Sequence, residues 1–155
     1  MVEQTLEYRF LAEMTAGLLT RGMHYEILRG DFDTNGYDIV IEVGGVTRHI
    51  QLKASIICGR SSYVPIHTAL AAKPSGCVVR MRYEPETLAI TGWEWFGGQP
   101  GERLPDLSHR VARHTKANSE GYKAVRPHLR ELKTSQFEKI AEPSVILDRL
   151  FGSVP

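Results

Sequence analysis

Two alternating, β-branched segments joined by a pair of glycines constrain the fold of this chain more than any other feature. Tyr37–Val43 and Val46–Lys53 each alternate apolar and polar residues, a pattern that is typical of half-buried strands. The intervening Gly44 and Gly45 predict a two-residue hairpin turn. In such a hairpin the residues that flank the turn face each other, and the residue numbers of every pair add up to 89.

This register predicts which side chains share a face of the hairpin. Asp38 is expected to face Gln51, and the two-residue period of a strand places Lys53 on the same face. That polar face carries Asp38, Val40, Glu42, Thr47, His49, Gln51 and Lys53. The opposite face carries Tyr37, Ile39, Ile41, Val43, Val46, Arg48, Ile50 and Leu52. Because the second face is the more apolar, we expect it to meet the main core.

The polar face brings a carboxylate, an amide oxygen and an ammonium to one end of the hairpin. A carboxylate from Asp38 and a neutral oxygen from Gln51 can share a hard cation such as Mg²⁺. The neighbouring Lys53 ammonium can hold an attacking hydroxide or stabilise negative charge on a phosphoryl oxygen. The set suits metal-assisted phosphodiester hydrolysis, and a plain solvated sheet face is the alternative.

The rest of the chain predicts a mixed α+β order. Residues 3–21 are expected to form a helix, because Leu6, Phe10, Met14, Gly17 and Leu18 recur at helical spacing, and Gly22 is expected to end it. We further expect a strand at 24–28, a short helix at 66–73, strands at 77–83 and 88–93, and helices at 126–133 and 144–151. This order predicts one α+β domain over residues 1–155, with a small mixed β-sheet flanked by helices. Its core is expected in residues 3–95, followed by a basic C-terminal extension, residues 101–155.

The net charge of +1 hides an uneven distribution. Residues 1–57 hold five Lys/Arg against eight Asp/Glu, a balance of −3, whereas residues 101–133 hold eight against four, a balance of +4. An acidic segment followed by a basic one suits a cation site beside a polyanion-binding surface. The side chains expected to contact phosphates are Arg110, Arg113, Lys116 and Lys123. Such contacts give affinity without sequence specificity.

At the hairpin residues Asp38, Gln51 and Lys53 the chain resembles the PD-(D/E)XK nuclease superfamily, whose restriction-endonuclease-like core runs α-β-β-β-α-β. The resemblance covers residues 3–83. The aspartate of the family corresponds to Asp38, and its (D/E)XK element corresponds to Gln51-Leu52-Lys53. The chain departs from the family pattern in having glutamine at the acidic position, as several restriction-endonuclease-like branches do.

The resemblance implies a Mg²⁺- or Mn²⁺-dependent nuclease, a hydrolase acting on DNA. It implies that Asp38, Gln51 and the Leu52 carbonyl hold the metal and that Lys53 orients or stabilises the nucleophilic water. It also implies a further carboxylate from the first helix, which binds the metal directly or through water. Glu13 is the favoured candidate for that role.

Glutamine at the acidic position lowers the negative charge of the site, so two other functions stay open. One is a non-catalytic DNA-binding module that keeps the fold. The other is a partner-dependent interaction protein that alone binds neither DNA nor metal. Glu7 is the other helix carboxylate considered for the site.

Several classes of protein are excluded by composition. With 42% hydrophobic and 24% charged residues, and no apolar run long enough to span a bilayer, the chain suits a soluble domain without a membrane partner. The N-terminus has no secretory pattern, so we expect a cytoplasmic protein.

Cys58 and Cys77 are expected to be reduced thiols, with a single disulfide left open. The amphipathic segment 145–151 is expected to pack on the sheet or against a second subunit, which leaves a homodimer possible.

Overall fold

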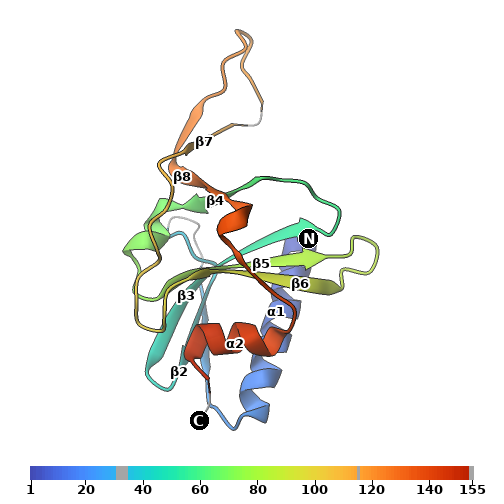
Figure 1. The fold of residues 1–155 in the computed structure, drawn as a ribbon, viewed down its shortest axis with the longest axis vertical. Helices are drawn as coiled ribbons and strands as arrows, with labels where there is room; N and C mark the ends of the chain where they lie inside the picture. The colour runs from blue at the N-terminus through green and yellow to red at the C-terminus, as the bar shows by residue number, and fades with distance from the viewer. Residues whose placement is uncertain (31–34, 115, 154–155) are drawn as a thin grey trace.

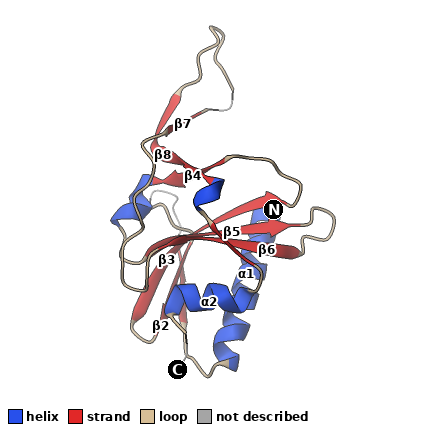
Figure 2. Ribbon diagram, in the orientation of Figure 1, coloured by secondary structure: helices blue, strands red, loops and turns tan. Residues whose placement is uncertain are grey.

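The computed structural model describes residues 1–30, 35–114 and 116–153, and it has the mixed α+β architecture that the sequence predicts (Figures 1 and 2). A six-stranded sheet has the order β1-β2-β3-β5-β6-β9, and a three-stranded sheet has the order β4-β8-β7. The helices are α1 (Val2–Thr20) and α2 (Pro143–Phe151), with the 3₁₀ helices η2 (Thr68–Ala72) and η3 (Thr134–Gln136). The strands are β1 (Glu26–Arg29), β2 (Ile39–Val43), β3 (Val46–Ile56), β4 (Tyr63–His67), β5 (Gly76–Tyr83), β6 (Ile90–Gly97), β7 (Val111–Arg113), β8 (Val125–Lys133) and β9 (Glu138–Ile140).

The hairpin of β2 and β3 has the predicted register. Its pairs run from Val43 with Val46 to Ile39 with Ile50, and the residue numbers of each pair add up to 89. The two turn glycines have φ angles of 55° and 82°, the positive values that this kind of turn requires. The long strand β3 then pairs in parallel with β5, whereas its pairing with β2 is antiparallel, so the sheet is mixed.

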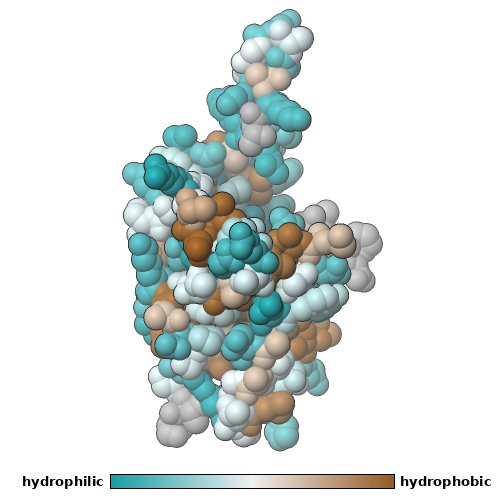
Figure 3. Space-filling view, turned by 90° about the vertical axis from the view of Figure 1, so that its right-hand side faces the viewer, coloured by the Kyte–Doolittle hydropathy of each residue, from teal (hydrophilic) through white to brown (hydrophobic). Residues whose placement is uncertain are grey.

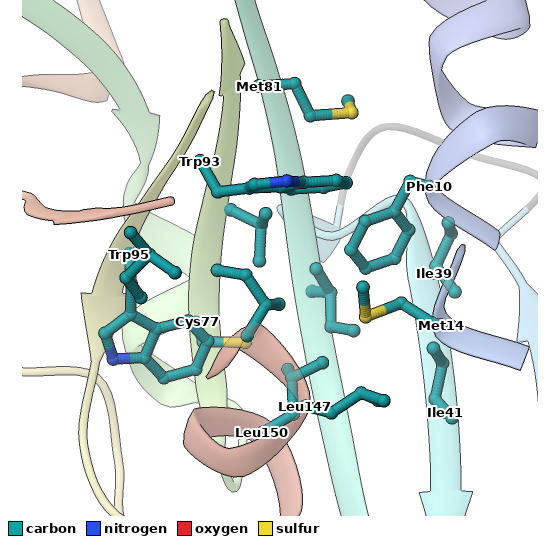
Figure 4. Packing of buried hydrophobic residues seen from close by; sticks show 14 of the residues in the cluster. Phe10, Met14, Ile39, Ile41, Cys77, Met81, Trp93, Trp95, Leu147 and Leu150 are labelled. Carbon is teal, nitrogen blue, oxygen red and sulfur yellow. The ribbon is translucent and has the colours of Figure 1, made fainter. Parts of the chain in front are cut away.

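The apolar face of the hairpin lies in the main core, as predicted. There it joins side chains from both α helices and from β5 and β6 (Figure 4). The four large apolar residues expected from helical spacing in α1 are at most 1% exposed: Leu6, Phe10, Met14 and Leu18. Gly17, on the same helix, allows α2 to approach closely, because a Cβ at this position would overlap Leu147 Cδ1. Both α helices therefore cover the same face of the large sheet.

Arg48 is fully buried on this face and ties the sheet to α2. Its guanidinium donates to the carbonyls of Leu150 at 2.6 Å and Arg149 at 2.9 Å, and also to the Gly98 carbonyl at 2.9 Å. The last carbonyls of a helix lack partners within the helix and carry its negative dipole end, so a cation suits them. Burial lowers the pKa of the Arg48 guanidinium.

The opposite face of the large sheet carries a second core beneath the three-stranded sheet. Its members are Val64, Ile66, Leu70, Val78, Phe96, Leu104, Leu132 and Phe137. Tyr37 packs against this core rather than the main one, because β2 begins only at Ile39 and the strand alternation does not extend back to Tyr37.

Two helix predictions are corrected on this face. Residues 126–133 belong to strand β8, because antiparallel pairing with β4 and β7 satisfies the backbone and places Leu132 in the second core. Residues 66–73 are divided between the end of β4 and the 3₁₀ helix η2, so only part of the predicted helix is helical. Pro143–Phe151 forms a helix close to the predicted 144–151.

The two cysteines are free thiols, as predicted. Cys58 is exposed and Cys77 is buried, and burial raises the pKa of the Cys77 thiol to about 12. Within residues 1–30, 35–114 and 116–153, neither α helix combines the length and apolar character needed to cross a membrane.

Candidate functional site

A cleft of about 910 Å³ opens on the polar face of the hairpin. Its walls come from the chain before β2, the middle of β3, the first turns of α1, and the strands β4 and β8. Asp38, Gln51, Leu52 and Lys53 all line this cleft. The structure therefore brings together the four residues that the hairpin pattern and the family resemblance singled out.

Asp38 lies immediately before β2, where the hairpin ladder ends. Gly36 has a φ of 76°, and a Cβ at this position would lie 2.8 Å from a backbone nitrogen of η2, so this turn requires glycine. The Asp38 N–H donates to the Ile50 carbonyl at 2.8 Å, and the Leu52 N–H donates to Asp38 Oδ2 at 2.7 Å. Asp38 is thus anchored to β3 through backbone groups, and it does not form the predicted ladder pair with Gln51.

Gln51 and Lys53 lie on β3. Gln51 is 9% exposed, and its Oε1 accepts a hydrogen bond from the His67 N–H at 3.4 Å. Lys53 is half-buried and lies beside Arg80 in the parallel ladder of β3 and β5. The buried Arg80 is ion-paired with Glu94 at 2.6 Å, so a carboxylate neutralises the guanidinium next to Lys53.

The backbone of β3 also directs a carbonyl toward Asp38. In an extended strand the N–H and C=O of one residue point toward the same neighbouring strand. Because the Leu52 N–H donates to Asp38, the Leu52 carbonyl is directed to that side as well. A carboxylate, an amide oxygen and a backbone carbonyl are therefore available at this corner of the cleft.

This donor set fits a hard divalent cation. Mg²⁺ prefers oxygen ligands, and it is usually held by one or two carboxylates together with waters and substrate phosphates. Mn²⁺ shares this preference for carboxylate, carbonyl and water oxygens. Among the described residues, no group of three or more His, Cys, Asp or Glu side chains is arranged to hold a metal. An oxygen-only donor set suits Mg²⁺ or Mn²⁺ better than Zn²⁺, which is commonly held by Cys and His side chains.

The structure does not bring Glu13 to the cleft. Glu13 is exposed on α1 and lines a separate hollow beside Trp93. Glu3 and Glu7 line the cleft instead, because the end of the hairpin that carries Asp38 and Lys53 lies beside the start of α1 rather than its middle. Glu7 Oε1 lies 3.4 Å from Arg29 Nε, so this carboxylate is partly neutralised.

The cleft residues that sequence reasoning missed include His67, His128 and Arg126. His67 Nδ1 accepts a hydrogen bond from the Ala69 N–H at 3.1 Å, which places the proton of the neutral ring on Nε2. The rings of His67 and His128 stack, with centroids 6.1 Å apart and planes 7° from parallel. The pairing of β4 with β8 brings these rings together, and the helical prediction for residues 126–133 concealed it.

The basic residues expected to contact phosphates lie on and beside a projecting hairpin. Arg113, Lys116 and Lys123 are exposed there. Arg110, at its base, is ion-paired with Glu131, and the hydrogen bond between them raises the pKa of Arg110. Three of the four predicted side chains are thus displayed on the hairpin, whereas Arg110 is held against the body of the protein.

No known family matches the sequence, and no curated protein matches it either. Among solved structures, the chain is similar to a bacterial homing endonuclease, with 18% identity and a TM-score of 0.30 over 73% of this chain and 80% of that chain. A similarity at this level carries no functional argument.

Proposed function

We propose that this protein is a metal-dependent nuclease that hydrolyses DNA phosphodiester bonds in the cleft beside β3. The observation that carries the proposal is that Asp38, Gln51 and Lys53 all line one cleft, which therefore presents an anionic oxygen, a neutral oxygen and a cation. Phosphodiester hydrolysis needs an activated water and positive charge where the transition state becomes more anionic.

The oxygen atoms that would hold Mg²⁺ or Mn²⁺ are the Asp38 carboxylate, Gln51 Oε1 and the Leu52 carbonyl. The bound cation would act as a Lewis acid and lower the pKa of a coordinated water. The Leu52 N–H already fixes the orientation of the Asp38 carboxylate. The His67 N–H does the same for Gln51, at a longer distance. These backbone contacts preorganise the donor set, so little reorganisation is needed when a substrate arrives.

Lys53 would place its ammonium beside the attacked phosphate, where it stabilises a phosphoryl oxygen and orients the nucleophilic water. The ion pair of Arg80 with Glu94 supports this role, because it neutralises the neighbouring guanidinium. The neutralised Arg80 then repels the Lys53 ammonium only weakly.

Incubation of supercoiled plasmid and single-stranded DNA with the protein, in Mg²⁺, Mn²⁺ or EDTA, tests the proposal. Asp38→Asn removes the carboxylate charge, and Glu42→Gln is its control, because Glu42 is an exposed carboxylate within β2 that does not line the cleft. The proposal expects cleavage by wild type and Glu42→Gln with either metal, and loss of cleavage in EDTA or with Asp38→Asn. Equal cleavage by all three proteins, or none by wild type with any substrate, would contradict it.

A DNA-binding module without catalysis is the second candidate, and glutamine at position 51 favours it. One carboxylate fewer at the metal corner lowers the expected affinity for a divalent cation. That function predicts salt-sensitive DNA retention that does not depend on metal and leaves the DNA intact.

A further inference from the structure

We propose that the hairpin tip beyond β7 and β8 enters the major groove of a DNA duplex whose backbone lies in the cleft, an inference that rests on the proposed function. This arm comprises the described residues 111–114 and 116–126. It extends from the β7–β8 end of the three-stranded sheet, away from the six-stranded sheet, and the rest of the protein does not pack around its tip (Figure 1). A surface that contributes so little to the core of this chain is available to a partner.

Backbone hydrogen bonds join the two sides of the arm. Beyond the β7–β8 pairs, the His114 N–H donates to the Ala124 carbonyl at 2.8 Å, and the Asn118 N–H donates to the Tyr122 carbonyl at 2.8 Å. At the tip, Asn118 Oδ1 accepts from the N–H groups of Glu120 at 3.0 Å and Tyr122 at 2.8 Å. These bonds give the arm a defined shape before it meets any partner.

The dimensions of the arm suit the major groove. Asn118 lies five residues after Arg113, the last residue of β7, so the tip reaches at most roughly 16 Å beyond β7 at about 3.3 Å per residue. The major groove is about 12 Å wide and about 8.5 Å deep and admits a two-stranded β-ribbon, whereas the minor groove is only about 6 Å wide. This upper bound exceeds the depth of the major groove, and a two-stranded hairpin is too broad for the minor groove.

The charge of the arm suits DNA phosphates. Within residues 111–126 there are four Lys/Arg and one acidic residue, Glu120. The basic side chains Arg113, Lys116, Lys123 and Arg126 are all exposed. The arm and its tip are largely hydrophilic in Figure 3. The Arg113 guanidinium lies over the ring of Tyr122, 6.0 Å from its centroid.

The arm is continuous with the cleft. Arg126 and His128 of β8 line the cleft, and β8 runs back into the arm through Val125. A duplex whose backbone contacts Lys53 therefore meets the arm on the adjoining wall. This continuity assigns the arm to the same double-stranded substrate and makes that duplex the preferred form over a single strand.

Binding without metal tests this inference separately from cleavage. The affinity of wild type is measured in EDTA for a plain duplex, the same duplex with glucosylated 5-hydroxymethylcytosine filling the major groove, and the single strand. A second protein has residues 114–124 replaced by Asn-Gly, a turn that closes the β7–β8 hairpin. We expect wild type to prefer the plain duplex and to lose at least 10-fold in affinity on the glucosylated one. The shortened protein should bind both duplexes equally and weakly.

A charge variant covers the case in which the shortened protein fails to fold. The slope of log affinity against log salt is negative, and Lys116→Ala/Lys123→Ala should make it shallower by about 2, since each phosphate contact contributes about 1. The control Arg60→Ala/Lys139→Ala removes two exposed charges outside the arm and the cleft, and it should leave the slope unchanged.

Equal wild-type affinity for plain and glucosylated duplexes would overturn the inference, and so would a preference for the single strand. Metal-dependent cleavage that persists in either case would leave the proposed function standing. Groove-dependent binding without any cleavage would instead support the arm and reject the catalytic proposal.

Discussion

The Leu52 N–H donates a hydrogen bond of 2.7 Å to the Asp38 carboxylate, which joins the residue before β2 to the centre of the Gln51-Leu52-Lys53 element on β3. This bond explains how a residue outside the strand ladder is held in the cleft. It also gives Asp38 a structural role that can be separated from its proposed role as a metal ligand.

Substitution of Asp38 should separate these two roles. Asp38→Asn keeps an oxygen acceptor for the Leu52 N–H, so its unfolding free energy should stay within about 0.5 kcal/mol of wild type, while cleavage is lost. Asp38→Ala removes the acceptor and should cost about 1–2 kcal/mol more. Urea unfolding of the two variants checks this order. Equal stability of the Asn and Ala variants would show that the hydrogen bond contributes nothing.

An acidic residue placed at position 51 should strengthen cation binding. Gln51→Glu adds a second carboxylate to the corner, so we expect Mn²⁺ to bind about 10-fold more tightly, because the affinity of oxygen-ligand sites rises with ligand charge. Calorimetric titration of the DNA-free protein measures this change, with Gln51→Leu as the control that should weaken binding. An unchanged dissociation constant in both variants would place the cation elsewhere.

Loss of the Arg48 guanidinium should destabilise the whole fold. Arg48→Met leaves the carbonyls of Gly98, Arg149 and Leu150 without their buried donor, so we expect a loss of about 3 kcal/mol or more. Arg149→Met is the matched control, because it breaks an exposed ion pair with Glu138 and should cost less than about 1 kcal/mol. Similar unfolding free energies for both variants would contradict this account.

Gly17 should be required by the contact between the helices. Gly17→Ala gains about 1 kcal/mol of helix propensity, but the new methyl group overlaps Leu147, so we expect net destabilisation by about 1 kcal/mol. In a Leu147→Ala background the same change should become neutral or stabilising. Urea unfolding of the four proteins in this cycle measures the coupling, and an identical effect in both backgrounds would refute the proposed contact.

Local pattern was sufficient to predict the hairpin and the first helix. The two-residue turn determines the register, so Ile39, Ile41 and Ile50 could be assigned to the core from alternation alone. The face of Tyr37 could not be predicted, because the chain leaves strand geometry between Tyr37 and Ile39.

The far wall of the cleft could not be predicted, because it depends on pairing between distant segments. His67 and His128 meet only through the β4–β8 ladder, in which residues about 60 positions apart are joined antiparallel. Polar residues and a proline near the start of 126–133 gave that segment a helical pattern, and its strand conformation depends on tertiary pairing.

Single-turnover cleavage of a duplex by Lys53→Met tests the central claim most directly. Lys139→Met is its control, because Lys139 is an exposed lysine outside the cleft. Binding to the same duplex is measured in Ca²⁺ so that occupancy can be matched. We predict that Lys53→Met lowers the cleavage rate at least 100-fold with the dissociation constant changed less than 3-fold, and that Lys139→Met behaves as wild type, since transition-state charge stabilisation of this kind is worth about 2.7–4 kcal/mol. Equal cleavage rates for Lys53→Met and wild type would contradict a nuclease site at this cleft.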